Sequence, residues 1–195
     1  MQQRRPNPER AEATRSALLA AARTLFVEKG YADTSTPEIV AAAKVTRGAL
    51  YHHYADKADL FRAVIEREAK AVADEIEASA SPDAPPGEAL LRGSLAYLEA
   101  MSVPGRTRLL LVDGPAVLGP GALAALDEAH AARTLREGLE AALRPPRQEG
   151  AFIEALTALL SAAFDRAALA IEAGGDRAAY TAAMIGLVER VTASR

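Results

Sequence analysis

Cysteine and tryptophan are absent from this chain of 195 residues, and aromatic residues make up only 5% of it. The lack of cysteine excludes disulfide bonds, thiolate zinc sites and cysteine nucleophiles, and it fits a reducing compartment. No apolar run is long enough to span a bilayer, and the N-terminal segment MQQRRPNPER lacks the apolar stretch of a secretion signal. We therefore expect a cytoplasmic protein that does not contact a membrane.

Alanine and leucine supply most of the apolar half of the sequence. Small and straight-chain residues favour helices that pack closely against one another. No alternating pattern typical of strands and no internal repeat competes with the helical spacing. The sequence therefore predicts an all-α protein.

The net charge of −3 is unevenly distributed along the chain. Residues 1–62 carry ten Lys and Arg against seven Asp and Glu, a balance of +3, whereas residues 63–195 have a balance of −6. The N-terminal third is therefore the part suited to a polyanion, although an excess of three charges is also common on an ordinary solvated surface.

The N-terminal third contains clear helix boundaries. Asn7 is suited to cap a first helix that begins at Pro8, and Gly30 ends it. Ser35 then caps a second helix, and Thr46 caps a third only about ten residues later. The predicted helices of this part cover residues 8–30, 36–43, 47–53 and 57–78.

The run from Ser79 to Gly87 contains three prolines, breaks the helical pattern and is the best candidate for a linker. We divide the chain into a small domain, residues 1–56, and a larger domain, residues 57–195, whose first helix, residues 57–79, connects the two. Beyond the linker, helices are predicted near residues 87–102, 120–143, 148–173 and 176–193.

Two of the three histidines, His52 and His53, are adjacent. Adjacent helical residues point about 100° apart, whereas a chelating pair is typically spaced four residues apart, and no recognisable ligand set completes the pair. Acid–base catalysis needs a pocket and a partner group, which a short helix after a tight turn does not offer. We therefore predict no metal, no cofactor and no enzymatic activity.

The segment around these histidines fits a different role. Two short helices joined by a turn of three or four residues form a helix-turn-helix motif, whose second helix enters the major groove of DNA with its N-terminal residues at the base edges. Arg47 can donate two hydrogen bonds to guanine, and Gly48 allows close approach of the backbone. The residues suited to donate to phosphates are Tyr51, His52, His53 and Lys57.

In order and spacing, residues 10–65 resemble the TetR/AcrR family of bacterial transcriptional regulators. The resemblance rests on Gly30-Tyr31, Thr34-Ser35, Ile39, Ala43, Val45, Gly48, Leu50-Tyr51, His53-Tyr54, Lys57 and Asp59-Leu60. It implies that the residues that meet DNA are Thr36, Thr46, Arg47, Gly48, Tyr51, His52, His53 and Lys57. It also implies that the core of the small domain includes Ile39, Val45, Leu50 and Tyr54.

Two residues depart from the family pattern, and the N-terminus leaves an alternative open. Lys44 replaces the glycine common in the turn, at a cost of about 1 kcal/mol if the backbone there is left-handed. Pro37 stands where some members place a base-reading side chain, which weighs against base readout from the second helix. Arg4 and Arg5 form either a minor-groove arm or a disordered terminus.

The resemblance implies that the larger domain binds a ligand and forms a dimer. Apolar stripes on the last two predicted helices either pair with a second copy as a four-helix bundle or face only their own core. The stripes are Phe152, Leu156, Leu159, Leu160, Ala163 and Ala167 on one helix and Tyr180, Met184, Leu187, Val188 and Val191 on the other. The candidate ligand contacts are Tyr97, Met101, Asp113, His130 and Phe164.

We therefore predict a homodimeric, sequence-specific regulator that binds double-stranded DNA at a palindromic operator, as a repressor whose binding an unknown small-molecule effector relieves. The alternative is a DNA-binding regulator that responds to no ligand. If side chains fill the interior of the larger domain, this alternative is favoured, whereas an open cavity would favour the repressor that responds to an effector. An enzyme is the third class, and no nucleophile, metal or cofactor signature supports it.

Overall fold

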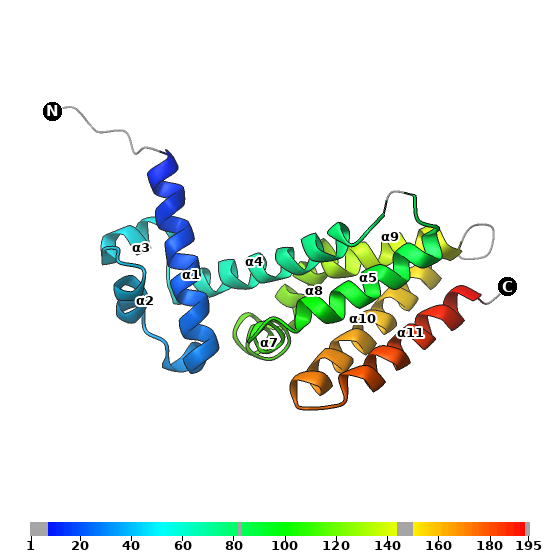
Figure 1. The fold of residues 1–195 in the computed structure, drawn as a ribbon. Helices are drawn as coiled ribbons and strands as arrows, with labels where there is room; N and C mark the ends of the chain where they lie inside the picture. The colour runs from blue at the N-terminus through cyan, green and yellow to red at the C-terminus, as the bar shows by residue number, and fades with distance from the viewer. Residues whose placement is uncertain (1–7, 82, 144–149, 194–195) are drawn as a thin grey trace.

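The computed structural model describes residues 8–81, 83–143 and 150–193, and within these ranges its regular elements are all helices. Figure 1 shows a small N-terminal bundle, a long helix that leaves it, and a larger bundle that contains the C-terminal helices. The elements are α1 (Pro8–Asp33), α2 (Thr36–Ala42), α3 (Arg47–His53), α4 (Lys57–Ala78), α5 (Pro86–Met101), α6 (Arg106–Arg108), the π-helical η1 (Leu109–Asp113), α7 (Gly114–Leu118), α8 (Pro120–Ala129), α9 (Ala131–Leu143), α10 (Gly150–Glu172) and α11 (Arg177–Ala193). The predicted all-α class is confirmed.

The helices of the small bundle begin and end close to their predicted residues. In α1, Gly30 has φ 80° and ψ 168°, so the continuous helix is interrupted where the sequence predicted its end. The proposed cap at Asn7 and the arm at Arg4 and Arg5 lie outside the described residues.

Two expectations about the larger bundle were wrong. The helix predicted over residues 120–143 is divided into α8 and α9 at His130, whose φ of −127° and ψ of −102° are not helical, although no glycine or proline marks the position. Residues 106–118, for which no helix was predicted, form α6, η1 and α7. Gly105 precedes this run in the left-handed region at φ 77°, and Pro115 stands in the first turn of α7, directly after the π-helical η1.

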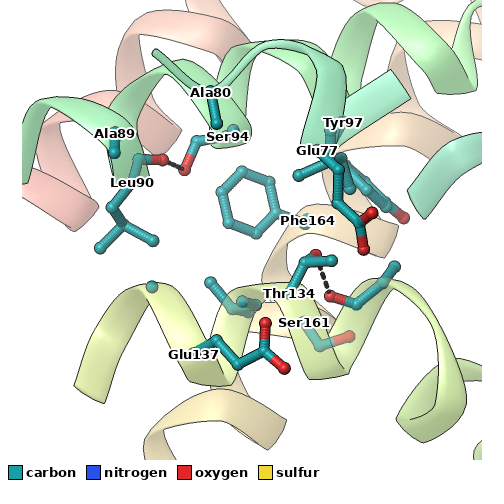
Figure 2. Close-up of a pocket in the computed structure, with 15 residues that line it drawn as sticks. Glu77, Ala80, Ala89, Leu90, Ser94, Tyr97, Thr134, Glu137, Ser161 and Phe164 are labelled. Carbon is teal, nitrogen blue, oxygen red and sulfur yellow. Dashed lines mark hydrogen bonds between the residues drawn. The ribbon is translucent and has the colours of Figure 1, made fainter. Parts of the chain in front are cut away.

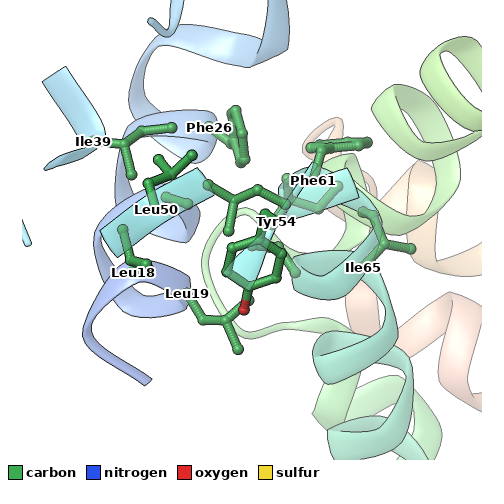
Figure 3. Close-up of a cluster of buried hydrophobic side chains, with 12 residues drawn as sticks. Leu18, Leu19, Phe26, Ile39, Leu50, Tyr54, Phe61 and Ile65 are labelled. Carbon is green, nitrogen blue, oxygen red and sulfur yellow. The ribbon is translucent and has the colours of Figure 1, made fainter. Parts of the chain in front are cut away.

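One apolar cluster holds the small bundle together (Figure 3). It contains the fully buried rings of Phe26 from α1 and Phe61 from α4, whose centroids are 5.0 Å apart in an edge-to-face arrangement. Leu109, from η1, is fully buried in the same cluster, so the cluster continues into the larger domain. The four predicted core residues also belong to it, with Ile39, Leu50 and Tyr54 buried and Val45 half-buried.

Side-chain caps fix the two helices on either side of the turn. Ser35 and Glu38 form a reciprocal capping box at the start of α2. Thr46 Oγ1 accepts a hydrogen bond from the backbone N–H of Ala49 at 3.2 Å and so caps α3. Between the helices, Lys44 has φ 54°, in the left-handed region that disfavours residues with a Cβ.

Lys44→Gly should therefore stabilise the protein by about 1 kcal/mol, because glycine adopts positive φ without a steric cost. Lys44→Ala removes the same charge but keeps a Cβ, so it serves as the control, and its free energy of unfolding should differ little from that of the parent. Chemical denaturation of the three proteins measures the difference. Equal stability of the glycine and alanine variants would show that this turn is not strained.

The helix α4 belongs to both bundles. Asp56 Oδ1 accepts a hydrogen bond from the backbone N–H of Asp59 at 2.8 Å and caps its first turn. The first half of the helix adds Leu60 and Val64 to the cluster of the small bundle, whereas Val72, further along, is buried in the larger one. A displacement of α4 would therefore affect both bundles.

The larger bundle surrounds its own apolar cluster. Buried side chains from α5, α9, α10 and α11 contribute Leu98, Leu139, Phe164 and Val188 to this cluster. The helices α10 and α11 lie side by side, away from α1, α2 and α3 (Figure 1). Within the described ranges, no helix is both long and apolar enough to cross a membrane.

Candidate nucleic-acid interface and interior cavities

The N-terminal end of α3 is exposed, and its side chains meet those of α2. Thr46, Arg47 and Gly48 are all exposed. The guanidinium carbon of Arg47 lies 5.5 Å from the centre of the Tyr51 ring, one helical turn further on. Hydrogen bonds with Thr36 of α2 and with Arg47 lower the pKa of Tyr51. The structure thus brings Thr36, Arg47 and Tyr51 into one polar surface that spans both short helices.

Packing against the described residues gives Gly48 no reason to be glycine. A Cβ at this position would meet only the Thr46 hydroxyl oxygen, at 3.9 Å, which is an ordinary contact. Glycine in a helix costs about 1 kcal/mol relative to alanine. The predicted close approach of the α3 backbone to DNA remains the available reason for this residue.

His52 and His53 lie at the C-terminal end of α3, with ring centroids 5.3 Å apart and an angle of 72° between the ring planes. His52 is exposed and His53 is half-buried. No group of three potential metal-ligating side chains occurs in the part of the chain that the structure describes. The role of both histidines as phosphate donors remains a prediction.

Lys57 makes contacts within the protomer that the sequence did not predict. Its ammonium group donates to the carbonyl oxygens of Tyr31 at 2.8 Å and Thr34 at 2.9 Å, and it approaches that of Ala32 at 3.5 Å. The same group lies 4.2 Å from the centre of the Tyr31 ring. Two of the three N–H donors of the ammonium thus fasten α4 to the end of α1, and the contact of Lys57 with a phosphate stays a prediction.

The predicted apolar stripes of α10 and α11 are divided between two faces. Part of each stripe is buried in the core of the same bundle, which is one of the two alternatives that the sequence left open. These inward-facing residues are Leu160, Ala167, Met184 and Val188. Leu156, Ala163 and Val191 are half-buried.

The remaining residues of the stripes are large, apolar and exposed. The exposed fraction is 48% for Phe152, 71% for Leu159, 38% for Tyr180 and 43% for Leu187. On each helix the two residues are seven positions apart, which is close to two turns, so they lie on the same side. We call these four residues the outer apolar face.

Two cavities lie inside the larger bundle. The first has a volume of about 230 Å³ and lies between α4, α5, α9 and α10, where Figure 2 shows the Phe164 ring between side chains of α5 and those of α9. The second has a volume of about 270 Å³ and is bordered by α4, α5, α8 and α10. Since about 150 Å³ of apolar space holds a benzene molecule, each cavity has room for a small aromatic compound.

Four of the five candidate ligand residues border these cavities. Tyr97 lines both, Phe164 lines the first, and Met101 and His130 line the second. Asp113 lines neither cavity, and its carboxylate instead pairs with Arg108 at 3.4 Å. A role for Asp113 in ligand binding stays a prediction that neither of these cavities supports.

Two acidic residues on the wall of the second cavity, Asp127 of α8 and Asp165 of α10, were missed by the sequence reasoning. Asp165 Oδ1 accepts a hydrogen bond from the Tyr97 hydroxyl at 2.5 Å, and Asp127 Oδ2 accepts one from the Ser161 hydroxyl at 3.0 Å. Burial raises the pKa of both carboxyls. Together with the negative charge of Asp127, burial raises the pKa of Asp165 to about 6. We call Asp127 and Asp165 the carboxylate pair.

The free energy of unfolding should therefore decrease as the pH rises from about 4 to about 6. In this window the folded protein binds more protons than the unfolded chain, because folding raises the pKa of Asp165 above its usual value of 3.8. The loss should reach about 2 to 3 kcal/mol, and Asp165→Asn should remove it. Denaturation of both proteins across this pH range measures the effect, with the exposed Glu172→Gln as control. Parallel pH profiles of the parent and Asp165→Asn would contradict it.

The carboxylate of Glu68, on α4, links the two bundles. It accepts hydrogen bonds from Arg23 Nε of α1 at 2.8 Å and from Arg106 Nε of α6 at 3.0 Å. Arg106 also donates to Glu75 at 2.9 Å and to the carbonyl oxygen of Ala100 at 2.7 Å. Burial opposes the charge of Glu68, but the two arginines outweigh it and lower its pKa. One buried carboxylate thus joins α1, α4 and α6.

Two families of known sequences match this chain, one for each bundle. Residues 18–64 match the family described as "Bacterial regulatory proteins, tetR family". Residues 87–194 match the family described as "Tetracyclin repressor-like, C-terminal domain". The first match contains the two short helices and their turn, and the second contains most of the residues that line the cavities.

Curated relatives and a solved structure agree with these matches. The HTH-type transcriptional repressor BepR of Brucella suis is 47% identical over 64 residues, which are 33% of this chain and 30% of that protein. The HTH-type transcriptional regulator AcrR of Shigella flexneri is 36% identical over 108 residues, or 55% of this chain and 50% of that protein. The chain thus matches half or less of the length of these relatives. The crystal structure of a TetR-family transcriptional regulator from Pectobacterium atrosepticum is 32% identical, covers 95% of both chains and has a TM-score of 0.70.

Proposed function

The chain belongs to the tetR family of bacterial regulatory proteins, and from this premise we propose that it is a homodimeric DNA-binding repressor that a small molecule releases from its operator. The observation that carries the proposal is the exposed N-terminal end of α3, with Arg47, Gly48 and Tyr51 on its surface. In a major groove, this end places Arg47 within reach of a guanine edge and Tyr51 near a phosphate. Because its target is DNA, its proposed location is the cytoplasm.

A dimer is part of the proposal, because one α3 helix reads only one half of a palindromic site. The outer apolar face supports it with two large apolar side chains on each of two adjacent helices. Single exposed apolar residues are ordinary, whereas a set on neighbouring helices is typical of an interface. Pairing α10 and α11 with their copies would bury this face in a four-helix bundle.

The two cavities favour a ligand-responsive regulator over a ligand-independent one. An interior filled by side chains would leave an effector no place inside the bundle, whereas this bundle has two spaces of about 230 and 270 Å³. The second cavity is also bordered by α4, which completes the core of the small bundle. A ligand there would contact α4, the helix that packs against the small bundle and follows α3 in the chain.

Selection of bound duplexes from a random library by the purified protein tests the DNA-binding proposal. We expect an inverted repeat whose half-sites are centred about 10 base pairs apart, or a multiple of that spacing. Arg47→Ala, selected in parallel, should lose base preference at one position in each half-site and about 1 to 3 kcal/mol of affinity. Failure to enrich any sequence would contradict the proposal.

Gly48→Ala should have opposite effects on stability and on DNA binding. It should stabilise the free protein by about 0.5 to 1 kcal/mol, since alanine is the better helix former, and weaken binding to the selected DNA, since its Cβ enters the interface. Gly121→Ala, on α8, has open space around its Cβ and is the control that should leave DNA binding unchanged. Thermal melting and fluorescence anisotropy measure the two effects. Unchanged DNA affinity in Gly48→Ala would rule out a close approach at this residue.

A further inference from the structure

We propose that the effector is a compact lipophilic cation, which places its apolar part in the second cavity and its positive charge against the carboxylate pair, Asp127 and Asp165. This inference rests on the proposed function and deepens it, because it assigns a chemical class to the effector.

The carboxylate pair lacks a strong counter-charge. Within the described part of the chain, neither Asp127 nor Asp165 forms an ion pair with a lysine or an arginine, and each accepts a hydrogen bond from a neutral hydroxyl group. His130 also lines the cavity and acts to lower the pKa of Asp127, although burial outweighs this effect. Glu68, by contrast, is buried between two arginines. A bound cation would give the carboxylate pair the compensation that Glu68 receives from the protein.

The rest of the second cavity suits an apolar group of limited size. Most of its lining is aliphatic or aromatic, and it includes Val72, Met101, Leu110 and the ring of Tyr97. Tyr97 is held by its hydrogen bond to Asp165, so its ring stands next to the carboxylate pair. A cation near this ring gains a further attraction from the ring face. The volume of about 270 Å³ suits one substituted ring rather than several fused rings.

An unpaired hydroxyl group marks the other side of the carboxylate pair. Thr157 is only 4% exposed, and its Oγ1 has no hydrogen-bond partner among the residues that the structure describes. It lines a groove between α8, α9 and α10 that Asp127 and Asp165 also line, so the pair separates this groove from the second cavity. Thr157, Ser161 and Asp165 are spaced four residues apart and lie on one face of α10. The carboxylate pair is therefore bordered by the second cavity on one side and by this groove on the other.

Titration calorimetry of the intact protein with three ligands of matched shape tests the effect of charge. The ligands are para-tert-butylbenzylamine, a cation at neutral pH, the neutral para-tert-butylbenzyl alcohol and the anion para-tert-butylbenzoate. We expect the amine to bind about tenfold or more tightly than the alcohol, and the benzoate to bind most weakly. The amine should also weaken binding to the selected DNA.

The variants locate the charge that produces this preference. Asp165→Asn keeps the shape of the side chain and should reduce the preference for the amine over the alcohol to less than about threefold, and Asp127→Asn should reduce it in the same direction. Glu172→Gln removes a negative charge from the exposed end of the same helix and should retain the full preference.

Two outcomes would overturn the inference and distinguish it from the proposed function. Equal affinity for the amine and the alcohol, or a preference that survives both asparagine variants, would overturn the cation assignment and leave the cavity as a site for a neutral effector. Binding of none of the three ligands would also overturn it, and the DNA selection would then decide the proposed function independently.

Discussion

Leu159→Glu combined with Leu187→Glu is expected to produce a folded monomer that binds the selected DNA at least about a hundredfold more weakly than the parent dimer. The two leucines belong to the outer apolar face and are 71% and 43% exposed, so charge at these positions should not disturb the core of the protomer. It would instead place four glutamates in the proposed four-helix bundle, where burial of their charges is costly. Loss of the dimer separates the two α3 helices, and each half-site must then be bound alone.

Sedimentation, circular dichroism and fluorescence anisotropy measure mass, folding and DNA affinity of this double variant. Val112→Glu is a matched control, because Val112 is also apolar and 49% exposed but lies in η1, outside both helices. Glutamate at Leu160 and Val188 would not test the interface, because these side chains are buried and the charge would unfold the protomer. An intact dimer of the folded Leu159 and Leu187 variant would move the interface to another surface.

Glu68→Gln is expected to reduce the free energy of unfolding by about 3 to 5 kcal/mol. The substitution retains the size of the side chain but removes the buried carboxylate that Arg23 and Arg106 share, so Arg106, only 6% exposed, keeps only its ion pair with the half-exposed Glu75. Glu66→Gln removes a charge from an exposed position of the same helix and should change stability by less than about 0.5 kcal/mol. Denaturant titration compares the three proteins, and equal losses in the two variants would remove the special role of Glu68.

The position of Glu68 also suggests how a ligand would act on DNA binding. Ala69 and Val72, which follow it on α4, line the second cavity, while Glu68 itself holds α4 to α1 and α6. We hypothesise that an effector pivots α4 and changes the separation of the two α3 helices, which must be about 34 to 36 Å to fit successive major grooves. Spin labels on the two copies of α3, compared with and without effector, would refute this if the distance distribution were unchanged.

The small domain was predictable because its signals are local. The caps at Ser35 and Thr46, the helix-ending Gly30 and the strained Lys44 each act within a few residues of the chain. Lys57 was not predictable in the same way, because its partners are carbonyl groups at the end of α1, 26 residues earlier in the case of Tyr31.

The larger domain depended on packing that the spacing of residues does not specify. Leu159 and Leu160 are adjacent and both apolar, yet one is 71% and the other 5% exposed, because α10 packs against other helices on one side only. Ser161 and Asp165 did leave a signal, as two polar residues four positions apart on an apolar helix. The sequence did not predict that Asp127 of α8 lies near Asp165. The position of α8 depends on the break at His130, where no glycine or proline indicates the end of a helix.

Hydroxyl-radical footprinting of the protein on its selected DNA tests the central claim most directly, namely that a dimer places two α3 helices in successive major grooves. For the parent protein, we expect two protected patches on one face of the duplex, centred about 10 base pairs or a multiple of this apart. At the same protein concentration, the Leu159 and Leu187 double variant should protect neither patch. A single patch that the monomeric variant protects equally well, or uniform protection without sequence preference, would contradict the claim.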